Sequence, residues 1–569
     1  MKSATPQHLT APKCSGRPVG TLTWNTTRNC FRLQAEPQVL QLAKRVFLGA
    51  SSGRATYVEF AATVRAVEDL NWLLLRFPVR IETDKLRGWR TKAVAHAAQR
   101  VALSALPPCV TPPTFNGALL PFQAEDVAKA VATQRTCVAW EVGLGKSVMS
   151  AACFAMSGAL PALIVSPAPI VGQWKEVIEA FLPGESVHVI RGLRPYELPA
   201  HTIGLIHYGL LRGWERELPA LGYRTVVFDE VQELRHLGTQ KYSAASRVSG
   251  AAEHVYGLSA TPIHNYGGEI WAVLNAIDEF CLGPQESFTR EWCNGYLGRT
   301  VVDPEALGAY LRQEGLMLRR TASEVRLQLP PVRRVPHVIE KDNGVYATRI
   351  AEAVALASRY SESRNFVERG RMAREIDSIS RQATGVAKAP FVAAFVRGLL
   401  EAGERVLVFA HHHEVHGILR EALKDYNPAL HNGMQPEAQK TEGKERFDRG
   451  ETPLAIIALR GAAGVDGWQS RGTTIVFAEL DWSPAIHTQC EGRLKRIGVS
   501  VDLESILAYY LVCDAGSDET MREALGLKVS QFVGLMGEAS ESEEDKVLAG
   551  RAAERQMARV IDALSREAA

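Results

Sequence analysis

Hydrophobic and polar positions follow a repeating order along most of this chain. Between residues 113 and 335, short apolar runs such as "TCVAW", "ALIVSP" and "TVVFDE" are separated by longer stretches with helical spacing. A second series, with "VLVFA", "PLAIIAL" and "TIVFAEL", fills residues 336–535. Strand-like runs that alternate with helical patterns are typical of parallel sheets covered by helices. The pattern therefore predicts two α/β units in tandem.

The two ends of the chain follow other patterns. Residues 1–112 mix helix-like and strand-like spacing and end in the proline-rich "LPPCVTPP", which is typical of a linker. Residues 336–395, at the start of the second unit, are helical by pattern and predict a helical insertion. The tail, 536–569, contains the acidic "ESEEDK" and then an amphipathic pattern. We expect an N-terminal accessory domain at one end and an acidic hinge with a helix at the other.

Charge is unevenly distributed between these parts. The chain carries a net charge of only +2, but residues 1–112 contain 16 Lys and Arg against 6 Asp and Glu. The remaining residues contain 49 against 57. A basic segment on an acidic body favours a module that binds a polyanion such as nucleic acid. A solvated basic surface without a partner is the alternative.

Several classes of protein are disfavoured. The nine cysteines are odd in number and form no C-x-x-C pair, which favours free thiols in a reducing compartment. The N-terminus has no apolar signal region, and no stretch approaches 18 uninterrupted apolar residues. The adjacent histidines 411–413 point in different directions at a strand exit, which is awkward for one metal site. We expect a soluble intracellular protein without a membrane partner.

The segment "AWEVGLGKS", residues 139–147, lies between an apolar run and a helical pattern. In that context backbone N–H groups and a helix N-terminus can bind phosphate, Lys146 can reach the β- and γ-phosphates, and Ser147 can ligate Mg²⁺. A full phosphate-loop pattern asks for Gly where this chain has Trp140. These residues alone leave a simple glycine turn as the alternative.

A pair of acids ends another apolar run, "TVVFDEVQEL". Asp229 at the carboxyl end of a strand suits Mg²⁺, which prefers oxygen ligands, and Glu230 could polarise an attacking water. The alternative is two exposed acids at a strand end. The lysine loop about 80 residues upstream favours a phosphoryl-transfer site in the same sheet.

Two further segments carry polar residues that suit this chemistry. In "GLSATPIHN", the hydroxyls of Ser259 and Thr261 could bond the acids, although the segment alone is an ordinary turn. In "HTQCEGRLKRIGVS", Arg493 and Arg496 are spaced to share one helical face. Directed at a γ-phosphate, they would act as arginine fingers in cis; otherwise they are surface charges.

The order of the motifs resembles a known family. In chain order they read "LLPFQAEDV", "EVGLGKS", "IVSPAPIVGQWK", "FDEVQ", "LSATPIHN", "VLVFAHHH", "ALRGAAGVDG" and "QCEGRLKRIG". This series is similar to superfamily 2 helicases, in particular the Swi/Snf-like branch of DNA translocases. The segments "VFAHHHEV" and "FAELDWSP" resemble the annealing-helicase (HepA-related) subgroup and its phage or bacterial relatives. The resemblance covers about residues 115–535.

The resemblance implies two tandem RecA-like domains, 113–335 and 336–535, that bind ATP and Mg²⁺ between them. Its catalytic positions fall on Lys146, Asp229, Glu230, Gln489, Arg493 and Arg496. Its nucleotide-binding positions fall on Gln123, Gly143, Gly145, Lys146, Ser147 and Gly467. Ser147 and Asp229 would hold the metal, and Gln123 would read the adenine edge. Gln232 stands where a histidine is commoner in the family.

The resemblance also implies a DNA partner, duplex or branched. The positions that track a nucleic-acid backbone fall on Ser166, Pro167, Tyr208, Arg235, Lys241 and Thr261. The expected function is an ATP-dependent DNA helicase or translocase. An RNA helicase and an ATP-gated DNA clamp that does not translocate are the alternatives. The expected location is the cytoplasm or nucleoid of a bacterial or phage-infected cell.

Overall fold

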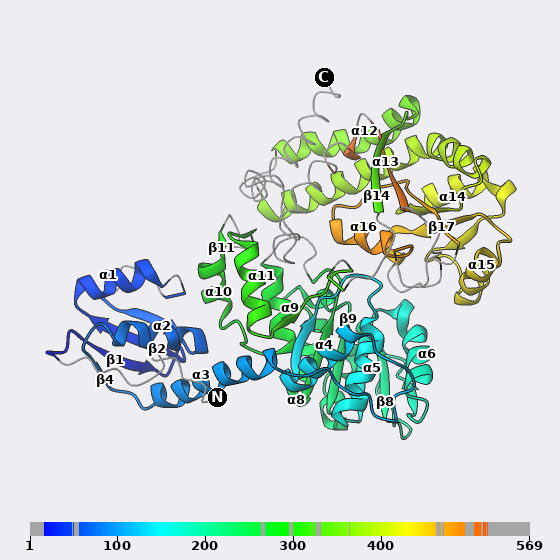
Figure 1. The fold of residues 1–569 in the computed structure, drawn as a ribbon. Coiled ribbons are helices and arrows are strands. Elements are labelled where there is room, and N and C mark those ends of the chain that lie inside the picture. The colour runs from blue at the N-terminus through cyan, green and yellow to red at the C-terminus, as the bar shows by residue number, and fades with distance from the viewer. Residues whose placement is uncertain are drawn as a thin grey trace.

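The computed structural model shows three large sheets that follow one another along the chain (Figure 1). A fourth, two-stranded sheet pairs β11 (Cys293–Asn294) antiparallel with β12 (Thr300–Val301). It describes residues 16–47, 49–50, 56–262, 268–294, 300–322, 324–325, 332–362, 365–462, 468, 471–495, 506–513, 516–518 and 521. We call residues 16–104 the N-terminal unit, residues 113–322 lobe 1 and residues 332–521 lobe 2.

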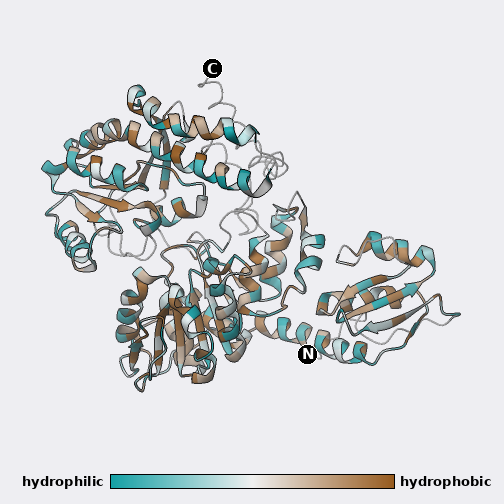
Figure 2. Cartoon of the chain, turned by 180° about the vertical axis from the view of Figure 1, so that it is seen from behind, coloured by the Kyte–Doolittle hydropathy of each residue, from teal (hydrophilic) through white to brown (hydrophobic). Residues whose placement is uncertain are grey.

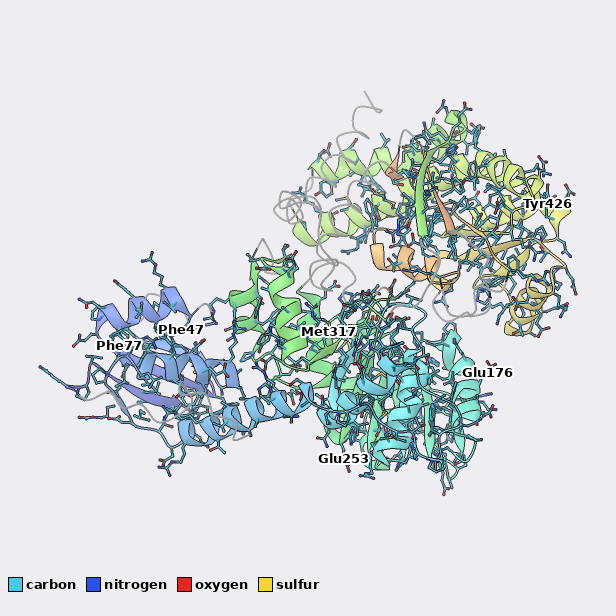
Figure 3. All side chains as sticks on the ribbon, viewed as in Figure 1. Phe47, Phe77, Glu176, Glu253, Met317 and Tyr426 are labelled. Atoms are coloured by element: carbon cyan, nitrogen blue, oxygen red, sulfur yellow. The ribbon has the colours of Figure 1, made fainter. Side chains whose placement is uncertain are left out.

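The N-terminal unit is a small α/β domain with its own core. Its sheet has the order β3-β2-β1-β4, in which β1 pairs antiparallel with β2 and parallel with β4. The strands are β1 (Gly20–Asn25), β2 (Cys30–Ala35), β3 (Val58–Ala61) and β4 (Val79–Ile81). The helices are α1 (Pro37–Val46), α2 (Val64–Leu74) and α3 (Lys85–Ser104). In Figure 3, Phe47 and Phe77 lie in this unit, and both pack against its core.

Lobe 1 is built on a seven-stranded sheet with the order β13-β5-β10-β9-β6-β8-β7. Every pair of neighbours in it is parallel. The strands are β5 (Arg135–Val138), β6 (Ala162–Ser166), β7 (Val187–Val189), β8 (Ile203–His207), β9 (Thr225–Asp229), β10 (His254–Leu258) and β13 (Met317–Leu318). The helices of eight residues or more are α4 (Pro121–Thr133), α5 (Lys146–Ser157), α6 (Val171–Phe181), α8 (Gln240–Ala251), α9 (Glu269–Ile277), α10 (Gln285–Trp292) and α11 (Pro304–Gln313).

Lobe 2 is built on a six-stranded parallel sheet with the order β14-β19-β18-β15-β17-β16. The strands are β14 (Val332–Val338), β15 (Val406–Ala410), β16 (Ala429–His431), β17 (Leu454–Ala458), β18 (Thr474–Phe477) and β19 (Ile506–Val512). The helices are α12 (Asn343–Glu362), α13 (Phe366–Glu401), α14 (His413–Ala422), α15 (Glu437–Arg449) and α16 (Pro484–Glu491).

These sheets confirm the predicted fold class of tandem parallel α/β units with a helical segment between them. In Figure 2 the strands of both lobes are mostly hydrophobic, and the covering helices show polar residues outward. This is expected for parallel strands that are covered on both faces. The predicted boundary at residue 335 falls inside β14, which pairs with β19 along its whole length. The second unit therefore begins by Val332, because the sheet needs the entire strand.

The long helix α13 is the one described helix with a segment, Glu368–Glu401, that is long and apolar enough to cross a membrane. In its most apolar part, 61% of the segment is buried inside the protein. Core helices of water-soluble proteins can be equally long and apolar. The burial is explained by its packing against lobe 2, where Val392 and Val396 join a cluster with β15. We therefore assign it no membrane role.

The N-terminal unit is docked on lobe 1 and is not merely tethered by a linker. Arg65 of α2 pairs with Glu291 at 2.6 Å, and its guanidinium lies 5.0 Å from the ring centre of Trp292. Arg100 of α3 donates to Glu314 at 2.7 Å. Because two helices of the unit make these contacts, the predicted separation of residues 1–112 from the motor is incomplete.

Asp69 lies at this docked interface, and burial raises its pKa to about 7, with Glu291 and Glu68 adding to the effect and Arg65 opposing it. The folded protein therefore keeps this proton up to a higher pH than the unfolded chain, whose pKa is about 4. This contribution to stability is complete below about pH 4 and is lost as the pH rises to about 7. We expect wild type to lose about 3 kcal/mol more than Asp69→Asn between pH 5 and pH 8. Denaturant unfolding measures this, and exposed Asp84→Asn is the matched control.

Candidate functional site

The lysine loop of lobe 1 has the geometry of an anion cradle. It follows β5 and ends at α5, with Gly143 at φ 86° and Gly145 at φ 84°. Such a backbone favours glycine. Lys146 Nζ donates to the carbonyls of Trp140 at 3.0 Å and Glu141 at 3.3 Å, which closes the loop. Among the described residues no side chain caps α5, so its first N–H groups are available to a phosphate.

The residue that breaks the phosphate-loop pattern, Trp140, is a packing residue. Its ring is fully buried, it meets Phe122 edge-on at 5.2 Å, and its Nε1 donates to Asp126 at 2.9 Å. Only its backbone carbonyl faces Lys146. A bulky side chain is tolerated here because it points into the core, away from the loop.

Gln123 supports the same loop from α4. Its Nε2 donates to Leu144 O at 2.9 Å, and its Oε1 accepts from the backbone of Leu120 at 2.9 Å. A Cβ on Gly145 would lie 2.7 Å from Gln123 Nε2. In this arrangement Gln123 holds the loop, and only 5% of the residue is exposed. Its expected role in reading adenine stays a prediction.

The paired acids stand at the carboxyl end of β9. Asp229 Oδ2 accepts from Trp174 Nε1 at 2.8 Å, and Oδ1 accepts from the backbone of Glu230 at 2.9 Å. Burial, together with the charge of Glu230, raises the pKa of Asp229 to about 7. Nearby Lys146 opposes that shift. A divalent cation would stabilise the ionised carboxylate, so the donor set fits Mg²⁺ held by Asp229 and Ser147.

Glu230 has a left-handed backbone, with φ 51° and ψ 53°. This conformation is uncommon for a residue other than glycine and is often found at functional sites. Its Oε2 accepts from Gln232 Nε2 at 2.5 Å and from Gln489 Nε2 at 3.3 Å. Gln232, which stands where a histidine is commoner in the family, therefore orients the carboxylate of Glu230.

Lobe 2 completes the cleft with residues of α16 and the turn after it. Gln489 bonds Glu230 across the lobes, and Arg493 is 4% exposed. Burial lowers the pKa of Arg493, while the charges of Glu230 and Asp229 oppose that shift. The Arg493 side chain is therefore within electrostatic reach of both acids. The structure brings together Lys146, Asp229, Glu230, Gln489 and Arg493, whereas Arg496 and Gly467 lie outside the described residues.

A second contact between the lobes was not anticipated from the sequence. Lys495 Nζ pairs with Glu141 Oε1 at 2.5 Å, and Glu141 Oε2 accepts from Ala322 N at 2.7 Å. Burial alone would raise the pKa of Glu141, but these two donors lower it overall. A Cβ on Gly492 would lie 2.4 Å from Val142. The sequence signals for this contact were Glu141, the acid before the glycines, and Lys495, the lysine inside "GRLKR".

The residues expected to follow a nucleic acid lie beside the carboxyl ends of neighbouring strands. Ser166 ends β6, Tyr208 follows β8 and Thr261 follows β10, so these three share one edge of the sheet. All three are buried, at 2%, 5% and 0% exposure. These three residues therefore present little surface to a nucleic acid in this conformation. Pro167 is half-buried beside Ser166.

Two cations stand near the same edge. Arg235 Nη1 donates to Gln232 O at 3.0 Å. Lys241 pairs with Glu233 at 2.5 Å and lies 5.6 Å from the Tyr208 ring. The hydroxyl of Ser259 accepts from the backbone of Thr261 at 2.9 Å, and no bond from either hydroxyl to the acids is seen in the described part of the chain. The nucleic-acid contacts stay predictions.

The adjacent histidines of lobe 2 serve a structural role. Glu479 accepts from the backbones of His411 at 2.6 Å and His412 at 2.9 Å, and from His412 Nδ1 at 2.5 Å. Burial lowers the pKa of His411 to about 4. Among the described residues no group of three or more His, Cys, Asp or Glu could hold a metal ion.

Comparison with known proteins identifies the family. The model of the SNF2-related domain matches residues 49–375, which is more than half of the chain. This chain belongs to the SNF2-related family. The match begins inside the N-terminal unit, in keeping with the docking of that unit on lobe 1.

Several curated SNF2-related proteins are similar over most of this chain. The SWI/SNF-related matrix-associated actin-dependent regulator of chromatin subfamily A-like protein 1 of Xenopus tropicalis is 28% identical over 75% of the chain and 45% of its own length. The DNA annealing helicase and endonuclease ZRANB3 of Mus musculus is 26% identical over 76% of the chain and 43% of its own length. The chain thus spans under half the length of these relatives.

A solved structure, the Sulfolobus solfataricus SWI2/SNF2 ATPase core in complex with dsDNA, is also similar. It has 18% identity and a TM-score of 0.38, and the match covers 79% of this chain and 98% of that one. The assignment of the fold rests on the sheet order given above.

The expected location in a bacterial or phage-infected cell is wrong. Curated relatives at 25–28% identity include proteins from Xenopus, Caenorhabditis elegans, Drosophila and mammals, and several are named as regulators of chromatin. The sequences of the motifs could not distinguish bacterial from animal proteins, because they are set by the chemistry of the cleft and not by the cell that contains the protein.

Proposed function

We propose that this SNF2-related chain is an ATP-dependent DNA translocase, which couples ATP hydrolysis to movement along or remodelling of duplex or branched DNA. The observation that carries the proposal is the shared cleft, in which Gln489 and Arg493 of lobe 2 face Glu230 of lobe 1. The relatives named as annealing helicases favour DNA as the partner.

Each cleft residue has a distinct role in this proposal. The loop from Gly143 to Lys146 holds the phosphates, and Glu230 takes a proton from the attacking water. Arg493 stabilises negative charge that develops on the transferred phosphoryl group. Bound Mg²⁺ would neutralise phosphate charge, with Ser147 and Asp229 as its protein ligands. The contacts Gln489–Glu230 and Lys495–Glu141 join the two lobes. Binding or loss of the nucleotide phosphates would therefore alter contacts of both lobes.

The substrate test compares the rate of ATP hydrolysis with different nucleic acids. We expect strong stimulation by duplex or forked DNA and little dependence on base sequence, because contacts to the backbone carry no sequence information. Structured RNA of the same length and charge is the control. Equal stimulation by RNA would replace this proposal with an RNA helicase.

A clamp that binds DNA without moving is the second alternative. Displacement of a third strand from a DNA triplex separates the two, since only a protein that moves along the duplex removes it. Displacement that requires hydrolysable ATP supports translocation. ATP hydrolysis stimulated by duplex DNA without displacement supports the clamp.

We further propose that the basic N-terminal unit adds phosphate contacts. Lys85, Arg87 and Lys92 of α3 are exposed. Their joint substitution by Gln should leave ATP hydrolysis without DNA unchanged and weaken DNA binding. Each lost contact lowers the slope of log K against log salt by about 0.9 on duplex DNA. Binding at several salt concentrations measures it, with the Gln variants of exposed Arg212, Arg216 and Arg247 as control. An unchanged slope would exclude DNA as the partner of α3.

A further inference from the structure

A second cavity lies outside the ATP cleft, where the N-terminal unit meets lobe 1. It has a volume of about 770 Å³ and is bounded by α3, α4 and residues 312–320, which run from the end of α11 past β13. In Figure 1, α3 runs from the N-terminal unit to this edge of lobe 1, and Figure 3 labels Met317, which lines the cavity. Its size is within the range of about 300–1,000 Å³ that small-molecule sites occupy.

The lining of the cavity is predominantly cationic. Its charged side chains are five cations and two carboxylates: Arg100, Lys129, Arg312, Arg319 and Arg320, with Glu68 and Asp126. The C-terminal ends of α3 and α4 also face it and together add about one negative charge. Glu125 and Glu314, which lie outside the lining, pair with Arg320 and Arg100, so the cavity carries little net charge once the helix ends are counted. Arg312 is a lining cation outside these pairs.

Arg312 is distinguished from the other cations by its contacts. Arg320 bonds Asp126 at 2.7 Å, and Arg100 bonds Glu314 at 2.7 Å. The Arg312 side chain has no ion pair or hydrogen bond to any residue that the structure describes, and its Nη1 is shielded from solvent without a partner. Burial lowers the pKa of Arg312, Glu324 opposes this and Arg319 adds to it. A guanidinium nitrogen that is shielded from solvent without an acceptor is unfavourable, and an anion in the cavity would supply one.

We propose that this cavity binds a phosphate-bearing anion through Arg312. The proposal goes beyond the ATP-dependent function and does not rest on it. Its chemistry suits either a free nucleotide or the terminal phosphate of a DNA strand, because both end in a terminal phosphate group of similar charge.

The cavity wall is continuous with the phosphate loop. Arg319 Nη1 donates to Ala139 O at 2.8 Å, and the backbone of Glu141 donates to Arg320 O at 2.9 Å. An anion bound here would therefore sit between α3 and the segment that begins "AWEVGLGKS". Occupancy of the cavity would couple the N-terminal unit to the ATP cleft.

The test is calorimetric binding of pyrophosphate to the full chain. Lys146→Ala removes the phosphate-loop site, so any remaining binding belongs elsewhere. We expect binding to persist in Lys146→Ala and to weaken at least about tenfold when Arg312→Gln is added, since a charge-assisted hydrogen bond is lost. Arg312→Lys should retain most of the affinity. Exposed Arg216→Gln, outside the cavity, is the matched control and should change nothing. Thermal unfolding checks that each variant is folded.

Two outcomes would overturn the proposal. One is loss of all pyrophosphate binding in Lys146→Ala, and the other is equal affinity with and without Arg312. Competition in the Lys146→Ala protein identifies the source of the phosphate. Displacement by ADP indicates a nucleotide, and displacement by a 5′-phosphorylated duplex but not its 5′-hydroxyl counterpart indicates a DNA end. Displacement by neither would also overturn it.

Discussion

Glu230→Gln is expected to bind ATP normally and to hydrolyse it about 10²–10⁴-fold more slowly, because the amide cannot accept a proton from water. The substitution keeps the size of a side chain held by Gln232 and Gln489. Nucleotide binding and single-turnover hydrolysis with DNA present measure the two effects separately. Lys146→Ala should instead lose binding, since the loop would lack its charge.

Glu233→Gln is the matched control for Glu230→Gln. It is the same chemical change in the same segment, but Glu233 is 42% exposed and pairs with Lys241 on the surface. Hydrolysis by this control should remain close to wild type. A Glu230→Gln protein that turned over ATP at the rate of this control would show that another group activates the water.

Arg493→Ala is expected to lower the rate of ATP hydrolysis about 10³–10⁵-fold, the usual effect of removing an arginine finger. The physical reason is that the buried guanidinium lies within electrostatic reach of Glu230 and Asp229. In the proposed site it would stabilise the negative charge that develops on the transferred phosphoryl group. The rate with saturating ATP and duplex DNA measures it. We expect Arg496→Ala to be nearly as damaging.

Arg493→Lys separates charge from folding. Lysine keeps a cation but not the planar fork, so partial activity is expected. Because Arg493 is buried, each variant needs a thermal unfolding curve and a nucleotide-binding measurement beside the rate. A folded Arg493→Ala protein with wild-type turnover would contradict a site shared by two lobes.

Much of the fold and most of the cleft could be predicted from the sequence, for reasons that are local. The apolar runs "TVVFDE" and "VLVFA" became central strands because such runs are buried on both faces of a parallel sheet. Lys146 and Asp229 were predicted to meet because the carboxyl ends of parallel strands share one edge, and they do influence each other. The order of the motifs then linked residues of lobe 2 to the same cleft.

What the sequence did not predict depends on contacts between distant segments. The bond from Lys495 to Glu141 joins residues 354 positions apart, and the docking of Arg65 on Glu291 joins two separate domains. Hydrophobic periodicity describes which face of an element is buried, not which surface covers it. For the same reason the sequence showed only that Trp140 departs from the phosphate-loop pattern, whereas the structure shows that its side chain lies in the core.

The helix α3 has a mechanical consequence. Its 20 residues span about 30 Å, and it is fastened near its end by the bond from Arg100 to Glu314. Because α2 is also held by the ion pair with Glu291, the N-terminal unit contacts lobe 1 through both of these ion pairs. Among the described residues it makes no such ion pair with lobe 2. When the lobes close and open, the unit should therefore travel with lobe 1 as a lever arm. A duplex gripped at the tip of that arm would be displaced farther than one held at the cleft.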